Sequence, residues 1–204
     1  MTRRPVRIGI TGPIGCGKST VARWLGERAG VVLIDADVVA REVLAAGSRE
    51  VEAVYARFGD GLRLVDGELD RAALGRIVFA DADALRDLEA IVHPAVRPRI
   101  LAKLADATAQ GAPAVVIEAI KLVEGGLAAL CDETWLVTCE PQAQLERLVA
   151  RGSAAEDASV RIAAQGDLTS RLGPAATHVI DTNGTMDEVR ATVLERLEAV
   201  LSTA

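Results

Sequence analysis

The sequence predicts an α/β fold in which three layers form around a parallel sheet, with a helical insertion and a helical lid. A β-prone run, Val6–Thr11, leads into a glycine-rich turn, and Gly17–Arg28 follows with a helical pattern. A second β-prone run, Val31–Ile34, comes next. A strand, a helix and a strand in this order form a βαβ unit, which implies parallel strands joined by a right-handed crossover.

Residues 38–110 read as mostly helical and form the predicted insertion between the second and third strands. Asp70 is placed to cap a short helix that runs toward Phe79, and Asp81 is placed to cap a longer one. We expect the proline of His93-Pro94 to kink or divide the longer helix, because proline removes a backbone donor and clashes with the preceding turn.

The second half of the chain returns to the alternation of strands and helices. The predicted strands are Ala114–Ile117, Thr134–Thr138 and Val179–Ile180, and the predicted helix starts are Pro141 and the capping boxes Ser153–Glu156 and Thr185–Glu188. A single domain follows from this pattern. Its core covers about 1–37 and 112–204, and its lid covers about 151–172.

Composition and charge exclude several classes of protein. The formal charge is −6 and the pI is about 5.1, so no global basic surface indicates a nucleic-acid partner. No apolar run approaches the roughly 20 residues that cross a bilayer. The cysteines, Cys16, Cys131 and Cys139, are odd in number and form no C-x-x-C pair, which predicts free thiols in a reducing, cytoplasmic compartment. We expect a monomer without membrane contact.

A phosphate-binding loop of the P-loop NTPase type is the strongest motif in the chain. Gly12 to Ser19 read G-P-I-G-C-G-K-S, which fits G-x-x-x-x-G-K-[ST]. The loop's backbone N–H groups can cradle the phosphates of ATP, Lys18 can reach the β and γ phosphates, and Ser19 can ligate Mg²⁺. Cys16 is interpreted as a small filler. The residues expected to bind the nucleotide are Gly12, Pro13, Ile14, Gly15, Cys16, Gly17, Lys18, Ser19 and Thr20.

Two acids follow the second strand. Asp35 and Asp37 lie at the carboxyl end of a predicted parallel strand, where open α/β sheets bind ligands. Their spacing gives the side chains similar directions if the chain stays extended. One can deprotonate an attacking hydroxyl and the other can hold a metal-bound water. The alternative is that one of them only caps the helix that starts at Val38.

Arginines mark the predicted lid. Arg147 and Arg151 lie four residues apart on one helix face, and Arg161 and Arg171 flank the next helical stretch. A closing segment that carries arginines can neutralise the charge that spreads over a transferring phosphate. The alternative is a solvated helix face.

Further segments make the chain resemble the dephospho-coenzyme A kinases from Ile8 to about Val189. The loop from Thr11 to Thr20 resembles the family's T-G-G-I-G-S-G-K-S/T. The other matching segments are Ile34-Asp35-Ala36-Asp37 with Ala40-Arg41-Glu42, Gly67–Arg71 with Leu74 and Phe79, Val92-His93-Pro94, and Arg161-Ile162 with Gln165. The resemblance implies a P-loop kinase with a helical acceptor domain and a lid.

The implied reaction is phosphorylation of the ribose 3′-hydroxyl of dephospho-coenzyme A by ATP, the last step of coenzyme A synthesis. By resemblance, Asp37 is the base. We expect Lys18 and Arg147 to complete the catalytic set, and Ser19 and Glu118 to serve the metal. The expected acceptor-side residues are Asp35, Arg41, Arg71, His93 and Arg97.

The chain also departs from the family pattern. After the third strand, where P-L-L-F/Y-E is usual, Glu118 is followed by Ala119-Ile120-Lys121-Leu122. Two alternatives therefore stay open: a kinase for another small hydroxyl or nucleotide acceptor, and a nucleotide-dependent switch. A switch for guanine nucleotides would be favoured by an N-K-x-D motif, which the sequence lacks.

Overall fold

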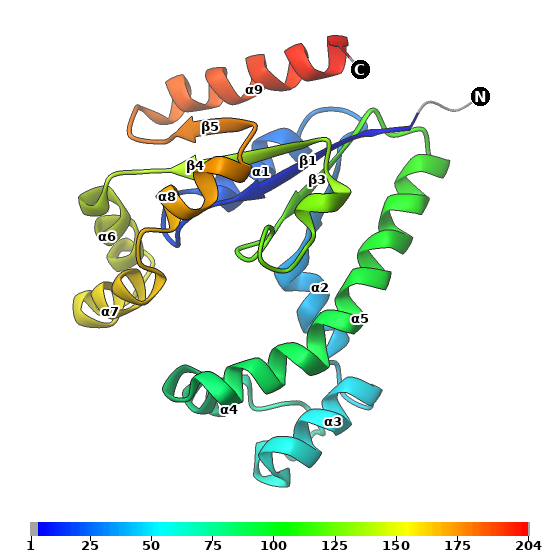
Figure 1. The fold of residues 1–204 in the computed structure, drawn as a ribbon, viewed down its shortest axis with the longest axis vertical. Helices are drawn as coiled ribbons and strands as arrows, with labels where there is room; N and C mark the ends of the chain where they lie inside the picture. The colour runs from blue at the N-terminus through cyan, green and yellow to red at the C-terminus, as the bar shows by residue number, and fades with distance from the viewer. Residues whose placement is uncertain (1–3, 204) are drawn as a thin grey trace. The chain divides into compact units, whose positions relative to one another are not determined.

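The computed structural model describes residues 4–203 and contains a five-stranded sheet. The strands are β1 (Val6–Thr11), β2 (Val32–Asp35), β3 (Ala114–Glu118), β4 (Glu133–Thr138) and β5 (His178–Asp181). All neighbouring strands pair in parallel, in the order β2-β3-β1-β4-β5 (Figure 1). The predicted α/β fold with a parallel sheet is therefore confirmed.

The chain divides into two compact units. One combines the chain up to Asp35 with the part from Leu104 onward, and it holds the sheet. The other spans Ala36–Lys103 and consists mainly of helices.

Helices cover both faces of the sheet in the first unit. On β4, Trp135 and Val137 are buried in a cluster with residues of α1 (Lys18–Gly26) and α9 (Met186–Thr203). Leu136 lies between them in sequence and packs instead against α8 (Leu168–Leu172). Successive residues of a strand point to opposite faces, so α1 and α9 cover one face and α8 covers the other.

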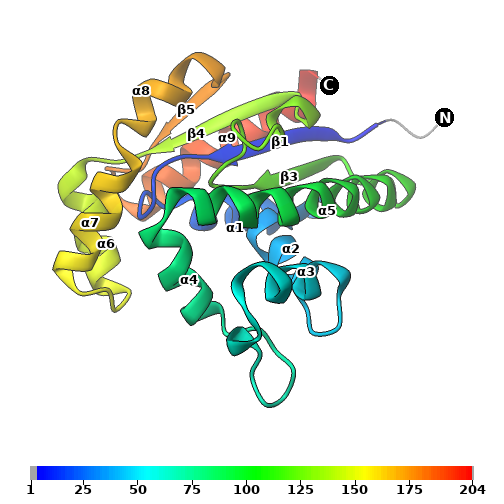
Figure 2. The same cartoon turned by 60° about the horizontal axis from the view of Figure 1, so that its bottom comes forward.

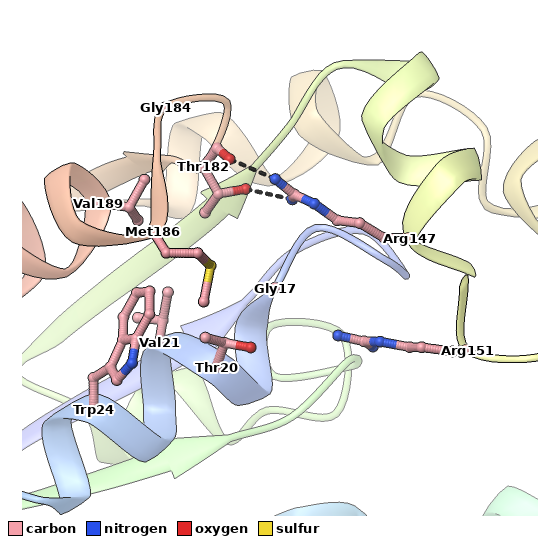
Figure 3. A pocket seen from close by; sticks show the side chains of 10 residues that line it. All are labelled: Gly17, Thr20, Val21, Trp24, Arg147, Arg151, Thr182, Gly184, Met186 and Val189. Carbon is pink, nitrogen blue, oxygen red and sulfur yellow. Dashed lines mark hydrogen bonds between the residues drawn. The ribbon is translucent and has the colours of Figure 1, made fainter. Parts of the chain in front are cut away.

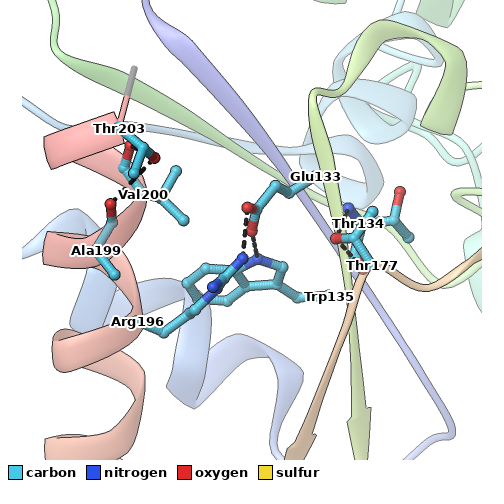
Figure 4. A network of polar contacts seen from close by, with 8 residues as sticks. All are labelled: Glu133, Thr134, Trp135, Thr177, Arg196, Ala199, Val200 and Thr203. Carbon is cyan, nitrogen blue, oxygen red and sulfur yellow. Dashed lines mark hydrogen bonds and ion pairs between the residues drawn. The ribbon is translucent and has the colours of Figure 1, made fainter.

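A buried indole and an ion pair connect β4 to the C-terminal helix α9. Trp135, which is fully buried, donates its indole N–H to Glu133 over 2.6 Å. The second oxygen of Glu133 accepts from Arg196 of α9, also at 2.6 Å (Figure 4). The start of α9 is fixed by the predicted capping box, in which Thr185 and Glu188 exchange hydrogen bonds.

The first helix of the segment predicted as a lid, about 151–172, packs against the helix that precedes this segment. α6 (Pro141–Ala150) follows β4, and α7 (Ala155–Gln165) lies against it (Figure 2). Pro141 opens α6 as predicted. The predicted capping box at Ser153 is wrong, because α7 begins after Ala154 and no side chain caps it.

The second unit contains α2 (Ala36–Val43), α3 (Arg49–Phe58), α4 (Arg71–Ala80) and most of α5 (Ala82–Ala109). Asp70 caps α4 as predicted, through a 2.8 Å hydrogen bond from the amide of Ala73. The His93-Pro94 step was expected to kink or divide a helix. It does not divide one, because α5 runs through Pro94 and Pro98 as a single helix. Figure 1 shows that this helix is bent. Within residues 4–203, no helix is both long enough and apolar enough to span a bilayer.

Candidate active site

The phosphate loop joins β1 to α1 and folds back over the end of the sheet. Gly12 has φ 142°, and a Cβ atom there would lie 2.1 Å from the carbonyl oxygen of Val137 on β4. Gly17 caps α1 in the left-handed region at φ 94°. Only glycine fits either position without strain, and the start of a helix such as α1 favours the binding of an anion.

Lys18 and Ser19 stand at the first turn of α1. Lys18 is 7% exposed, and its Nζ donates to the carbonyl oxygen of Pro13 over 2.9 Å, so the side chain folds back along its own loop. Ser19 donates its hydroxyl to Glu118 Oε1 over 2.6 Å. Glu118 is itself buried and ends β3. A cationic amine, a hydroxyl and a carboxylate are thus gathered where the loop meets the sheet.

The acid that lies beside Glu118 is Asp35. The register of β2 and β3 pairs these two residues at the carboxyl ends of adjacent strands. The argument that Asp35 and Asp37 share a direction is wrong, because the chain does not stay extended after β2. The helix α2 begins at Ala36 rather than Val38, which places Asp37 in its first turn.

The donor set at this point fits a hard divalent cation in part. Such an ion takes oxygen ligands and keeps several waters, so one hydroxyl and one or two carboxylates are sufficient protein ligands. Ser19 Oγ and Glu118 Oε1 supply adjacent oxygens. Within residues 4–203, no group of three or more His, Cys, Asp or Glu side chains is arranged to hold a metal.

A pocket of about 230 Å³ opens beside α1 (Figure 3). Apolar side chains form one wall, and Arg147 and Arg151 enter from the other side. The apolar wall consists of Val21, Trp24, Met186 and Val189. Gly17 and Thr20 belong to both the pocket and the phosphate loop region, so the pocket continues from the loop.

Arg147 is fixed by Thr182, which sequence reasoning missed as a site residue. The guanidinium donates to Thr182 Oγ1 over 2.8 Å and to its carbonyl oxygen over 2.6 Å (Figure 3). Thr182 Oγ1 also lies 2.9 Å from the carbonyl oxygen of Cys16 and 3.0 Å from that of Thr138. This buried threonine therefore joins the loop, the end of β4 and α6. The sequence signal that could have identified Thr182 is its position just after the last predicted strand, where ligands bind in open α/β sheets.

Cys16 and Cys139 form a disulfide, so the prediction of three free thiols is wrong. They are 123 residues apart, and they meet because the loop after β1 lies beside the residue that follows β4. Cys16 is fully buried and cross-links the loop, which also corrects its interpretation as a filler. Cys131 stays free, and burial, reinforced by Asp132, raises the pKa of its thiol to about 12.

The residues expected on the acceptor side lie in the second unit, apart from Asp35. Arg41 donates Nε to the carbonyl oxygen of Asp37 one turn earlier in α2, over 3.2 Å. Arg71 donates to the carbonyl oxygens of Arg41 and Leu44 over 3.0 and 3.1 Å. Arg71 thus ties α4 to the end of α2, which brings Asp37, Arg41 and Arg71 into one connected group.

His93 and Arg97 lie elsewhere in the second unit, four residues apart on α5. Both are exposed, and their spacing places them on one face of the helix.

Comparison with known proteins gives one answer at the level of family. The dephospho-CoA kinase family model matches residues 6–188. A dephospho-CoA kinase of Geobacter sulfurreducens is 42% identical over 189 residues, which cover 92% of this chain and 95% of the relative.

Two solved structures resemble the fold over nearly its whole length. TT1252 from Thermus thermophilus has a TM-score of 0.79 and 33% identity, with 98% of each chain covered. The dephospho-CoA kinase from Campylobacter jejuni has a TM-score of 0.72 and 24% identity, and the match covers 97% of this chain and 98% of that one. Because the family model spans both the phosphate loop and the helical unit, the chain belongs to the dephospho-CoA kinase family.

Proposed function

We propose that this protein transfers the terminal phosphate of ATP to the ribose 3′-hydroxyl of dephospho-coenzyme A, giving coenzyme A and ADP. The observation that carries the proposal is the gathering of Lys18, Ser19 and Glu118 at the phosphate loop, in a chain of the dephospho-CoA kinase family. Such an arrangement supplies a buried cation and metal ligands for a triphosphate.

The nucleotide is proposed to lie along the loop and in the adjoining pocket. The loop amides and Lys18 bind the phosphates, and the adenine ring enters the pocket of about 230 Å³. The apolar wall around Trp24 and Met186 suits the faces of a purine ring, while Arg147 and Arg151 stand on the polar side.

Ser19 and Glu118 would hold Mg²⁺, directly or through a water. When bound, the ion neutralises charge on the β and γ phosphates. The 2.6 Å contact between the two side chains keeps both oxygens close together, and Asp35 adds a carboxylate on the neighbouring strand.

In the proposed reaction, Asp37 accepts the proton of the ribose 3′-hydroxyl as that oxygen bonds to the γ phosphorus and the bond to ADP breaks. This role rests on the position of Asp37 in the I-D-A-D segment. Lys18 stabilises the charge on the transferring group, and Arg147 assists from α6. The acceptor is bound by Asp35, Arg41, Arg71, His93 and Arg97.

The proposed partners are these two small molecules, and the proposed working form is a monomer of 21.4 kDa in the cytoplasm. Light scattering on the purified protein tests the oligomeric state. A mass near twice this value would reject the monomer without affecting the proposed reaction.

The function is tested by measuring ADP release with a panel of acceptors that includes dephospho-coenzyme A, nucleoside monophosphates and shikimate. We expect turnover to be fastest with dephospho-coenzyme A and to fall to background without an acceptor. Clear turnover of another acceptor, with none of dephospho-coenzyme A, would reject the proposal and identify a different small-molecule kinase. ATP binding without turnover of any acceptor would favour a nucleotide-dependent switch.

A further inference from the structure

In the phosphate loop, the backbone N–H and C=O groups of one residue are both hydrogen-bonded to glutamine side chains. The carbonyl oxygen of Ile14 accepts from Gln144 Nε2 over 2.6 Å, and the amide of Ile14 donates to Gln165 Oε1 over 2.8 Å. Gln144 belongs to α6, and Gln165 is the last residue of α7. The two helices that follow β4 therefore both contact the loop at Ile14.

Gln144 is a buried side chain that holds the loop by packing as well as by its hydrogen bond. Its side chain is buried at 6% exposure, and α6 packs closely against the loop beside it. A Cβ atom on Gly15 would lie 2.9 Å from the carbonyl oxygen of Gln144 and 3.1 Å from Leu148. The helix α6 and the loop are thus closely packed. Replacing Gln144 would therefore disturb the structure of both, and not only one hydrogen bond.

Gln165 differs because it lies at the end of α7 and is less buried than Gln144. The helix stops there because Gly166 adopts φ 59°, a conformation that favours glycine. Gln165 is half-buried, and most of α7 is exposed. One turn before Gln165, on the same face of the helix, stands the exposed Arg161. The hydrogen bond to Ile14 therefore fixes the end of the helix that carries this arginine.

We infer that Gln165 is a positioning residue for phosphoryl transfer. It docks the lid helix α7 on the phosphate loop and thereby holds Arg161 where it can neutralise charge on the transferring phosphate. The inference deepens the proposed function and rests on it. Gln144 and Thr182 still shape the loop when Gln165 is removed, so ATP binding should persist while the transfer step slows.

The kinetic test compares Gln165→Ala with the matched surface change Gln142→Ala on α6. In Gln165→Ala, we expect kcat to fall about fivefold, the factor set by one net hydrogen bond, with the KM for ATP changed less than twofold. Gln142→Ala should behave as the wild type. In an Arg161→Ala background, Gln165→Ala should cost no further activity, because the effect acts through that arginine. A wild-type kcat in Gln165→Ala, a loss confined to KM, or additive losses in the double variant would each overturn the inference.

A second measurement needs no acceptor and so separates this inference from the proposed function. The rate of trypsin cleavage after Arg151, Arg161 or Arg171, measured without nucleotide, reports the fraction of molecules in which the lid is detached from the loop. We expect cleavage about fivefold faster in Gln165→Ala, and at the wild-type rate in Gln165→Glu, whose carboxylate can accept the same N–H. Equal rates in the wild type and Gln165→Ala would overturn the docking. If the wild type does not phosphorylate dephospho-coenzyme A but the cleavage rates differ as expected, the proposed function fails while the docking stands.

Discussion

Breaking the disulfide between Cys16 and Cys139 should lower the stability of the folded protein substantially. The bond closes a loop with a sequence separation of 123 residues, and loop-closure entropy for about 120 residues corresponds to about 5 kcal/mol. Measured contributions of disulfides are commonly about 2–4 kcal/mol. We therefore expect a loss of about 2–5 kcal/mol, which lowers the Tm by about 4–20 °C for a chain of this size.

The assay is chemical denaturation of the wild type and of Cys139→Ser, each with and without dithiothreitol. Mass spectrometry first establishes that the two cysteines are bonded in the purified protein. The wild type should lose stability in reductant, whereas Cys139→Ser should already be less stable and should not respond. Cys131→Ser is the matched control, because that cysteine lies outside the bond, and it should keep the full response to reductant. A bonded wild type whose midpoint is the same with and without reductant would refute the reasoning.

Three further experiments test the phosphate loop, the cap of α9 and the proposed roles of the two acids. Gly12→Ala should reduce ATP binding at least tenfold, measured by calorimetry, because its Cβ would lie 2.1 Å from the carbonyl oxygen of Val137; unchanged affinity would contradict the loop geometry. Glu188→Gln should lower the Tm at pH 7. The hydrogen bonds that Glu188 accepts lower its pKa below the ordinary value of 4.5, so the carboxylate stabilises the fold above that pH and loses this effect as the pH falls through the lowered pKa. The Tm difference from the wild type should thus shrink as the pH falls below the ordinary pKa of 4.5 and through the lowered pKa, and a constant difference would count against the cap. Asp37→Asn should lower kcat at least a hundredfold with ATP affinity little changed, and Asp35→Asn should lower it less; the reverse order would exchange their proposed roles.

The central strands were located well from the sequence because they are buried on both faces. All five residues of β3, Ala114–Glu118, are buried, and such strands read as continuous apolar runs. The prediction ended β3 one residue early because Glu118 is charged. At the edge of the sheet, β2 was displaced by one residue: Leu33 is 40% exposed there, and only Ile34 is buried.

The phosphate loop was predictable because all of its defining residues are adjacent in the chain. The contacts that complete the site depend on strand order, which carries no local signal. Cys16 meets Cys139, and Ser19 meets Glu118, because β1 lies between β3 and β4. The same reason explains why Thr182, which is 166 residues from its partner Cys16, was not identified as a site residue from the sequence.

The central claim is tested most directly by the chemical nature of the product. The purified protein is incubated with ATP, Mg²⁺ and dephospho-coenzyme A, and the product is analysed by mass spectrometry and by ³¹P NMR. The account predicts coenzyme A with the new phosphate on the ribose 3′-oxygen, and a rate at least a hundredfold lower in Lys18→Ala, which should fold as the wild type does. A product phosphorylated at another position, no product at all, or an unchanged rate in Lys18→Ala would contradict it.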